Sequence, residues 1–431
     1  MDKSIIESYP CYESYKDSGY DWIGQVPSNW KDIPNKYVFN IINNKVGKKS
    51  DNYVLLSLTL QGIIKRDMIN AQGKFPAEFD TYQEVKKNDF VFCLFDVEET
   101  PRTVGLSDYN GMITGAYTVF RAYSQFDERF IYYYYLNLDL DKRFKPLYRG
   151  LRNTIPKDWF MSFKTYFPNK MEQTGIAKFL DKKTLKIDKA IELKQQQIKK
   201  LEEYKQIVIQ NAVTKGLNPD VPMKDSGVDW IGEIPEHWQT NRLGVILSEV
   251  SSKNHPDLPL LSITREKGVI KRDIEDYDSN HNYIPDDLAG YKKIVKGQFG
   301  MNKMKAWQGS YGVSKYTGII SPAYYVFDIA AELNKDFFST AIRSRLYINY
   351  FRSASDGVRI GQWDLNKVRM KAMVFVIPPI EEQIAIEAYL QSKFEQTKNL
   401  VAIKQQEIDL LTEYKTVLIN EAVTGKIKVA S

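Results

Sequence analysis

The sequence contains one tryptophan-rich segment at two places. Residues 16–30 have the sequence KDSGYDWIGQVPSNW, and residues 224–238 have the sequence KDSGVDWIGEIPEHW. Further matching segments follow in the same order up to the C-terminus, at offsets between 205 and 210 residues. A long internal period of this kind indicates a duplicated structural unit. We therefore expect two copies of one module, and two similar but unequal halves are suited to bind a target that itself has two unequal halves.

The matched segments alternate with stretches in which the two copies differ. The matches are LLSLT with GIIKRD (55–67) and LLSIT with GVIKRD (260–273), GMITGAYTVF (111–120) and GIISPAYYVF (318–327), and residues 172–213 with 382–423 at a constant offset of 210. The constant offset of the last pair leaves no room for an insertion, as a continuous helix requires. Residues 92–110, in contrast, share little with residues 301–317.

Length and composition exclude several classes of protein. The 431 residues suffice for two to four domains. Cys11 and Cys93 have no counterparts in the second copy, so neither a disulfide framework nor a repeated zinc site is expected, and the reducing cytoplasm is the expected compartment. No signal segment is evident, and no apolar run approaches the ~18 residues of a membrane span, so no membrane partner is expected. The net charge of +6 favours a polyanionic partner only weakly.

The predicted fold class is mixed α/β, with two α/β domains and two long helices. Segments rich in β-branched and aromatic residues predict strands at 53–60, 89–95 and 113–120. Helices are predicted at 129–144 and, in the second copy, at 336–352. The predicted division is a first α/β domain at 1–168, a first helical arm at 169–216, a second α/β domain at 217–378 and a second helical arm at 379–431.

Each arm carries a heptad-like row of apolar residues, interrupted at equivalent places by Lys194 and Lys404. At ~1.5 Å per residue, an arm of about 40 residues makes a rod of roughly 60 Å. Neither arm has enough apolar surface to fold alone, so we expect the arms to pair, and to pair antiparallel because each leaves one domain toward the other. The alternative is that each helix packs only on its own domain. The expected seam residues are Leu180, Ile187, Ile191, Ile198, Leu201 and Val208 in the first arm, and Leu390, Leu400 or Val401, Ile408, Leu411 and Leu418 in the second.

Motifs that would indicate catalysis are missing from the sequence. It contains no GxxxxGK[ST] phosphate loop, no GxGxxG turn and no Asn/Asp-Pro-Pro-Tyr/Phe motif. His237, His255 and His281 have neither the spacing of metal ligands nor an assigned catalytic partner. Asp181 begins a DKK tripeptide that resembles the tail of a nuclease motif, but we expect it on the solvated polar face of the first arm. The sequence therefore predicts a binding protein without a metal site.

Basic residues at equivalent positions in the two copies are candidates for phosphate contacts. Arg152 and Arg359 each follow a glycine by two residues, and Lys145 aligns with Arg352. Such contacts position a protein on a duplex without specifying its sequence. For the 142–145 segment, a solvated helix remains an equal alternative.

The divergent segments 98–103 and 303–312 are candidates for base contacts. They combine charged, aromatic and amide side chains with glycines that allow close backbone approach. Ordinary variable surface loops are the alternative. The complete set of candidate DNA-binding residues is Lys65, Arg66, Arg102, Lys145, Arg149, Arg152, Asn153, Lys271, Arg272, Lys305, Gln308, Arg352, Arg359 and Gln362.

Three motifs together resemble those of the specificity subunit of type I restriction-modification systems. They are the WIGxxPxxW opening, the PxxEQxxI start of the second arm (379–386, degenerate at 169–176) and an EYK tripeptide near the end of each arm. The resemblance covers essentially the whole chain, and the duplicated order makes it specific. In that family two target recognition domains bind the two halves of a bipartite asymmetric DNA site, and paired helices set the spacer and dock two methyltransferase subunits.

The resemblance implies a non-catalytic chain whose partners are double-stranded DNA, two methyltransferase subunits and restriction subunits. The cofactors would belong to those partners: S-adenosylmethionine to the methyltransferase, ATP and Mg to the restriction subunit. Two modules on one face of a duplex would lie ~10 bp or a simple multiple apart. Two alternatives stay open: a duplicated coiled-coil scaffold that binds protein, and the specificity part of a fused restriction-methylation enzyme, which the missing catalytic motifs disfavour.

Overall fold

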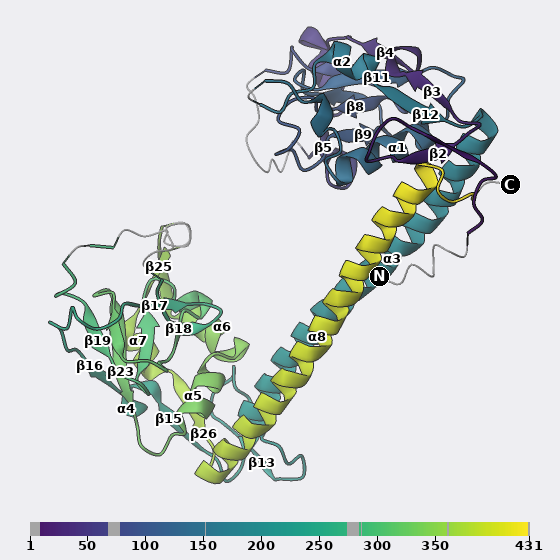
Figure 1. Ribbon diagram of the computed structural model, residues 1–431. Coiled ribbons are helices and arrows are strands. Elements are labelled where there is room, and N and C mark those ends of the chain that lie inside the picture. The colour runs from purple at the N-terminus through teal and green to yellow at the C-terminus, as the bar shows by residue number, and fades with distance from the viewer. Residues whose placement is uncertain are drawn as a thin grey trace. The chain divides into compact units, whose positions relative to one another are not determined.

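The chain forms two compact units (Figure 1). This computed structural model describes residues 9–67, 78–150, 152–273, 284–285, 287–359 and 362–429, with only the backbone at 358, 359 and 362. Unit 1 comprises Met1–Gln195 with Gln405–Ser431, and unit 2 comprises Gln196–Lys404. Both boundaries fall inside the helical arms, so each unit contains one half of each long helix. Among the described residues no helix combines the length and the apolarity that a membrane span needs.

Unit 1 is built on a four-stranded antiparallel sheet. Its elements are β1 (Tyr15–Asp17), β2 (Gln25–Pro27), β3 (Lys31–Pro34), η2 (Asn35–Tyr37), β4 (Phe39–Ile42), η3 (Gly47–Asn52), β5 (Leu56–Thr59), β6 (Gly62–Lys65), β7 (Gln83–Val85), β8 (Phe90–Phe92), β9 (Val104–Leu106), β10 (Gly111–Ile113), β11 (Thr118–Ala122), α1 (Glu128–Leu140), η4 (Lys145–Leu147), α2 (Lys157–Ser162) and β12 (Lys164–Phe167). The sheet order is β4-β11-β8-β9, and β1-β2, β3-β12, β5-β6 and β7-β10 form antiparallel pairs. Phe39, Phe92 and Phe120 of the sheet pack against Tyr135 of α1 and Phe160 of α2, and all five side chains are buried.

Unit 2 repeats this topology. Its elements are β13 (Met223–Asp225), β14 (Glu233–Pro235), β15 (Gln239–Arg242), α4 (Leu243–Ile246), β16 (Leu247–Val250), β17 (Leu261–Thr264), β18 (Gly268–Lys271), β19 (Lys292–Ile294), β20 (Phe299–Asn302), η5 (Ala306–Gln308), β21 (Tyr311–Val313), β22 (Gly318–Ile320), β23 (Tyr324–Ile329), α5 (Lys335–Ile342), α6 (Arg345–Ser353), β24 (Ser355–Arg359), β25 (Gln362–Leu365), α7 (Lys367–Ala372) and β26 (Val374–Ile377). The sheet order β16-β23-β20-β21 corresponds strand by strand to that of unit 1. The α6 helix and the β24-β25 hairpin have no counterparts among the named elements of the described part of unit 1.

A close backbone approach explains two of the matched segments. An added Cβ at Gly111 would lie 2.3 Å from the carbonyl oxygen of Val54, and one at Gly318 would lie 2.4 Å from that of Pro259. Parallel bridges link the next residues, Leu55 to Met112 and Leu260 to Ile319. Only glycine fits where one backbone approaches another so closely. The LLSLT and GMIT segments therefore match in sequence because they touch each other in each unit.

The arms are the helices α3 (Lys170–Lys215) and α8 (Ile380–Val423), and they pack together. In unit 1 the first half of α3 and the last half of α8 join one core, through residues such as Leu180 and Leu418. In unit 2 the last half of α3 and the first half of α8 join the other core, through residues such as Val208 and Leu390. The pairing is therefore antiparallel, and the predicted fold class of mixed α/β domains with a helical pair is confirmed.

The predicted seam is most tightly buried near the globular parts. Leu180, Leu390 and Leu418 are fully buried, and Ile187, Ile408 and Val208 are at most 9% exposed. Ile191, Ile198, Leu201 and Leu411 are half-buried. Of the two alternatives in the second arm, Leu400 is 45% exposed and Val401 is half-buried, so Val401 faces the partner helix.

Three predicted elements are wrong in extent. The strand predicted at 113–120 is two strands, β10 and β11, because the chain turns between Thr114 and Tyr117. The helix predicted at 336–352 is divided into α5 and α6, because Ser344 adopts an extended backbone. The helix predicted at 129–144 ends at Leu140, and Lys142 then takes a left-handed conformation with φ 49°.

Candidate nucleic-acid interface

A tryptophan and a glutamate attach each α/β domain to a long helix. In unit 1, Trp30 Nε1 donates to Glu172 Oε1 of α3 at 3.4 Å. In unit 2, Trp238 Nε1 donates to Glu382 Oε2 of α8 at 2.9 Å. Both indoles are fully buried. The WIGxxPxxW and Glu-Gln motifs thus form one joint, which we call the Trp–Glu joint.

The glutamine next to each of these glutamates binds the start of a helix of the adjoining α/β domain. The Gln173 side-chain oxygen accepts from the backbone N–H of Asp127 at 2.9 Å, and Gln383 accepts from that of Asn334 at 2.8 Å. Asp127 and Asn334 are the N-caps of α1 and α5. Each glutamine amide also donates to the carbonyl of a proline before its arm, at 2.9 Å. The sequence comparison identified the repeat of this glutamine without its role.

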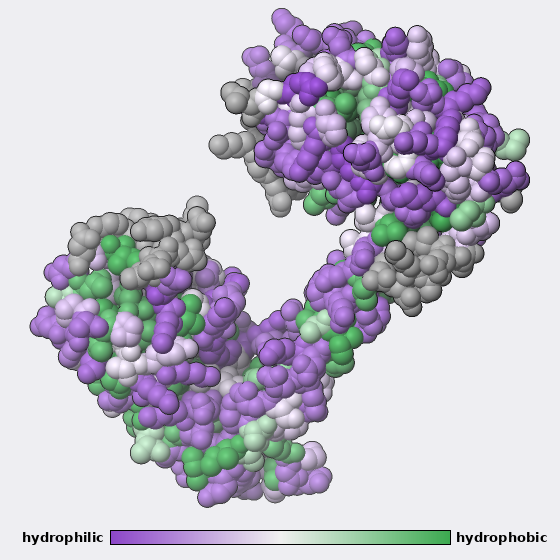
Figure 2. Space-filling model, viewed as in Figure 1, coloured by the Kyte–Doolittle hydropathy of each residue, from purple (hydrophilic) through white to green (hydrophobic). Residues whose placement is uncertain are grey.

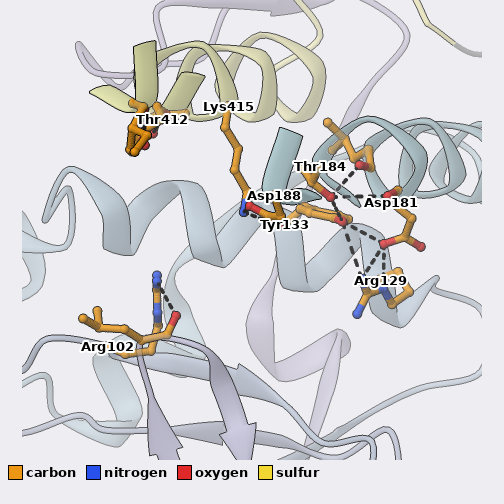
Figure 3. A network of polar contacts seen from close by, with 12 residues as sticks. Arg102, Arg129, Tyr133, Asp181, Thr184, Asp188, Thr412 and Lys415 are labelled. Atoms are coloured by element: carbon orange, nitrogen blue, oxygen red, sulfur yellow. Dashed lines mark hydrogen bonds and ion pairs between the residues drawn. The ribbon is translucent and has the colours of Figure 1, made fainter. Parts of the chain in front are cut away.

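A polar network joins α1 to the first arm (Figure 3). The Tyr133 hydroxyl donates to Asp181 Oδ1 at 2.7 Å and lies 3.1 Å from Thr184 Oγ1. Arg129 Nε donates to the same carboxylate oxygen at 3.1 Å. Burial raises the pKa of the Tyr133 hydroxyl. The Asp181 side chain is 39% exposed, as a solvated helix face requires, but its carboxylate is also bound by two side chains of α1, which the sequence did not indicate.

Arg102 is bound by neighbouring groups and holds the 98–103 segment in place, so it is not a free surface cation. Its guanidinium lies 3.3 Å from Asp139 and donates to the carbonyl of Leu60, and its side chain is 11% exposed. The Asp139 carboxylate also accepts from the backbone N–H of Thr103 at 2.9 Å and from Lys142 at 2.9 Å. These contacts hold the 98–103 segment and the β5-β6 turn on α1.

Unit 2 uses a different arginine to hold the corresponding turn. Arg343, at the end of α5, donates to the carbonyls of Arg265 and Glu266 between β17 and β18, at 2.7 and 2.8 Å. It also donates to the carbonyl of Tyr311 at 3.1 Å. Both hairpins are thus fixed by a guanidinium at their turn, although the two arginines occupy non-equivalent places in the sequence.

The KRD segments place equivalent cations at the ends of these hairpins. The Lys65 ammonium lies 4.7 Å from the centroid of the Tyr109 ring, and that of Lys271 lies 5.4 Å from Tyr316. Arg66 and Arg272 follow, and their backbone N–H groups donate to the matched leucines at the start of each LLS segment. The structure therefore puts Lys65 and Lys271 in the same local setting.

Two candidates in unit 1 are engaged by neighbouring acids. Lys145 Nζ lies 3.0 Å from Glu98, and the Asn153 amide donates to Glu99 at 3.3 Å. These contacts bring the two predicted segments, 98–103 and 145–153, together in space. The Lys145 side chain is still 64% exposed.

Arg149 and Arg152 are exposed cations beside that pair. The Arg149 guanidinium lies 3.9 Å from the centroid of the Trp159 ring and donates to the carbonyl of Tyr148. Arg152 is exposed and has no side-chain partner among the described residues. These two arginines are the most available cations among the candidates of unit 1.

Unit 2 presents an aromatic and cationic cluster at its divergent segment. Trp307 and Trp363 stack with ring centroids 5.0 Å apart, and the guanidinium of Arg352 lies 5.9 Å from each ring. Arg352 and Lys305 are exposed, and Gln308 is half-buried. The indoles restrict where the Arg352 guanidinium can lie, so its charge is positioned before any ligand binds.

Arg359 and Gln362 pair in register across the β24-β25 hairpin. Their side chains lie outside the described part of the structure, so their predicted contacts remain predictions. The described residues contain no group of three or more His, Cys, Asp or Glu side chains that could hold a metal ion.

No model of a known protein family matches the sequence. A chain from the structure of a type I restriction-modification system, solved to explain complex assembly and conformational transition, superposes with a TM-score of 0.64. The match covers 92% of this chain and 98% of that chain at 14% identity. The chain shares the fold of a type I restriction-modification protein. The HsdS subunit from Thermoanaerobacter tengcongensis (TM-score 0.49, 14% identity, 95% and 100% covered) and the S subunit from M. genitalium (0.36, 13%, 91% and 96%) superpose less well.

Within this type I restriction-modification fold, matched and divergent segments occupy different places. The matched motifs lie at the Trp–Glu joints and the glycine approaches, where buried contacts restrict the residue type. The divergent segment 98–103 of unit 1 carries Arg102, and the divergent segment 303–312 of unit 2 carries Lys305 and Gln308, whereas Arg152 and Arg352 stand at positions that are basic in both copies. The two copies therefore share a frame and differ on their exposed cationic loops.

Proposed function

We propose that this chain is the DNA-recognition subunit of a type I restriction-modification complex. The observation that carries the proposal is the superposition on a type I restriction-modification chain over 92% of this chain. In the proposal, each unit binds one half of a bipartite asymmetric duplex site. Methylation and cleavage belong to partner subunits, which hold S-adenosylmethionine, or ATP and Mg.

The difference between the exposed loops supports separate half-sites. Base edges are distinguished by the donors and acceptors that face them, so different side chains select different bases. In the divergent segments, unit 1 has Glu98, Glu99 and Arg102, whereas unit 2 has an ammonium at Lys305 and an amide at Gln308. Cations on these loops would also contact phosphates, which position the protein on any duplex.

The surface of the arms supports docking of protein partners. Apolar side chains remain exposed on both helices, and Figure 2 shows apolar residues among hydrophilic ones on the arm surface in view. Exposed apolar patches can mark interaction sites. Exposed apolar arm residues include Leu185, Leu193 and Leu410 in unit 1 and Tyr204, Ile207, Ile384, Leu400 and Ile403 in unit 2, each between 45 and 59% exposed. We propose that two methyltransferase subunits bind here, and that the helix length sets the spacer.

Reconstitution tests the proposal. The chain purified with its methyltransferase partner should methylate one bipartite sequence in the presence of S-adenosylmethionine, as sequencing of modified DNA would detect. The chain alone should methylate nothing. Methylation by the chain alone would contradict the subunit proposal, and a complex that binds protein partners without selecting DNA would favour the scaffold alternative.

An exchange of domains assigns the half-sites. Replacing residues 9–168 with the corresponding domain of a relative should change one half-site and leave the other intact. The matched control replaces residues 222–378, which should change only the other half-site. A simultaneous change in both halves would show that the two units do not recognise DNA separately.

A further inference from the structure

An open cleft of about 450 Å³ lies in unit 2, where α5 meets the two arm helices. Four cationic side chains line it: Lys205 of α3, Lys267 between β17 and β18, Lys315 after β21, and Arg343 at the end of α5. Glu266 is the one carboxylate in the described lining, and it forms an ion pair with Arg265 at 2.7 Å. The lining therefore carries an excess of positive charge.

The equivalent place in unit 1 is filled by side chains. The N-caps Asp127 and Asn334 align α1 with α5, so Tyr133 of α1 corresponds to Thr340 of α5. The Tyr133 ring extends to the first arm and bonds to Asp181, as Figure 3 shows. In unit 2 the smaller Thr340 leaves that volume open, and Gln391 stands where unit 1 has Asp181.

The two units also differ in whether the arm lysine at this place has an ion-pair partner. In unit 1, Lys415 Nζ pairs with Asp188 at 2.7 Å. At the 210-residue offset between the arms, Lys205 corresponds to Lys415, whereas Lys398 replaces Asp188. The Lys205 ammonium instead lies 4.5 Å from the centroid of the Phe394 ring, with no ion pair among the described residues. Unit 2 therefore has the corresponding lysine without the carboxylate that pairs with it in unit 1.

At three further positions of the cleft, unit 2 has a cationic residue where unit 1 has an acidic or uncharged one. Lys315 stands where unit 1 has Asp108, Lys267 where it has Gln61, and Arg343 where it has Leu136. Arg343 donates only to backbone carbonyls, so its charge is held in place without a carboxylate to neutralise it. Glu387 supplies a further carboxyl group next to the cleft lining, and this group accepts from the Gln391 amide at 2.6 Å.

We propose that this cleft of unit 2 binds a phosphate group, supplied by a small phosphorylated molecule or by the backbone of a duplex. Lysine ammonium groups bind phosphate as point charges. The hydroxyl of Ser339 and the amide of Gln206 line the same cleft and supply uncharged donors, whereas the Thr340 hydroxyl and the Gln391 amide are hydrogen-bonded to Glu387. The volume lies within the range of small-molecule sites. The proposal does not depend on the DNA-recognition function, because a free phosphate compound tests it.

Calorimetric titration of the full chain with pyrophosphate at low ionic strength is the first measurement. Lys205→Gln combined with Lys315→Gln should weaken pyrophosphate binding about tenfold or more, because two of the charges that attract it are gone. Thr340→Tyr combined with Gln391→Asp should abolish binding, because it rebuilds the hydroxyl–carboxylate pair that fills unit 1. The matched control is Lys415→Gln, whose lysine has its own carboxylate, and it should leave the affinity unchanged.

The salt dependence of duplex binding distinguishes the two sources of phosphate. If the duplex supplies the phosphate, the Lys205→Gln/Lys315→Gln variant should reduce the slope of log affinity against log salt by about one per lost contact. Pyrophosphate should then compete with the duplex. If a small molecule supplies it, the slope should equal that of the parent while pyrophosphate affinity falls.

The proposal is overturned if neither pyrophosphate affinity nor the salt slope differs between the lysine variant and the Lys415→Gln control. The same conclusion follows if pyrophosphate binds the parent and the filled-cleft variant equally. Lys267 and Lys315 are exposed, so Lys267→Gln/Lys315→Gln gives a measurement in a folded chain even if the filled-cleft variant fails to fold.

Discussion

The C-terminal ends of the two arm helices make the same contact with an α/β domain, one within a continuous stretch of chain and one without a peptide link. After α3, Gly216 has φ +74°, and a Cβ there would lie 3.1 Å from the Trp238 ring. After α8, Gly425 has φ +73°, and a Cβ there would lie 3.1 Å from the Trp30 ring and 2.4 Å from Pro27. Left-handed backbone at a helix end favours glycine. The same packing of glycine on tryptophan thus forms with and without a covalent connection.

The C-terminal segment replaces the missing connection in unit 1. The backbone N–H of Lys428 donates to the carbonyl of Pro10 at 2.7 Å, and the Tyr15 hydroxyl donates to the carbonyl of Lys426 at 3.4 Å. Ile427 is 3% exposed and belongs to the core of unit 1. The comparison teaches that packing holds this joint, and that residues 424–429 hold unit 1 as the 216–222 linker holds unit 2.

The largest expected effect comes from the two tryptophans. Trp30→Ala and Trp238→Ala should each destabilise their own unit by about 3–5 kcal/mol, because each removes a fully buried indole. Denaturant unfolding measures this loss. Limited proteolysis should distinguish the two variants: Trp30→Ala should release residues 424–429 for cleavage, whereas Trp238→Ala should leave them protected. Equal protection in both variants would show that the segment is held independently of the indole.

The capping glutamines should have the next largest effect. Gln173→Ala and Gln383→Ala should each cost about 1–3 kcal/mol, because a part-buried backbone N–H and a buried glutamine–carbonyl hydrogen bond lose their partner. Unfolding of each variant should report the loss in its own unit. The control is Gln197→Ala, an exposed arm residue, for which little change is expected. A similar loss for the control would show that the effect belongs to the arm and not to the cap.

Replacing Glu387, whose counterpart on the first arm is Ala177, should have a smaller effect on stability and should stabilise the protein. Burial raises the pKa of Glu387, so its folded pKa exceeds the unfolded value. A raised carboxyl pKa means that the folded state binds the proton more tightly, and stability falls as pH rises from the unfolded pKa through the folded pKa. Glu387→Gln should therefore stabilise unit 2 by about 1 kcal/mol or less at neutral pH. Unfolding curves should converge near pH 3, and a constant difference down to that pH would contradict the assignment.

Circular permutation should have the smallest effect. Joining residues 9 and 429 by a short linker and opening the chain at 217–222 exchanges the covalent and non-covalent arm ends. Because both ends already make the same contact, the free energy of unfolding should change by about 1 kcal/mol or less. The site methylated by the reconstituted complex should be unchanged. Loss of unit 2 in the permuted chain would show that its joint needs the peptide link.

The two arm helices and their pairing could be predicted from periodic patterns in the sequence. The constant offset in the arms and the heptad-like rows led to two helices and an antiparallel pair, because both patterns depend on residues close together in the sequence. The strand limits were harder, since the turn between Thr114 and Tyr117 lies inside a continuous apolar segment.

The candidate site was predicted only as a set of segments. Whether Lys145 is free depends on Glu98, and whether Arg102 is free depends on Asp139, and neither pair is marked by spacing or motif. The contact of Arg343 with the β17-β18 turn could not be predicted from the sequence either. Arg265 lies 78 residues away and contributes a backbone carbonyl that any residue could supply. Contacts of this kind become visible only when the fold brings distant segments together.

The Trp–Glu joint also has a consequence for how such genes change. In each copy the tryptophan comes before most of the α/β domain and the Glu-Gln pair comes directly after it, so the two parts of the joint bracket the segments in which the copies differ. Genetic crossovers within these two matched segments would transfer a whole domain together with a compatible joint. The sequence likeness that keeps the buried contacts intact would then also provide the homology for recombination. Under the proposed function, inheritance of a new DNA preference would then require no new adjustment of the arms.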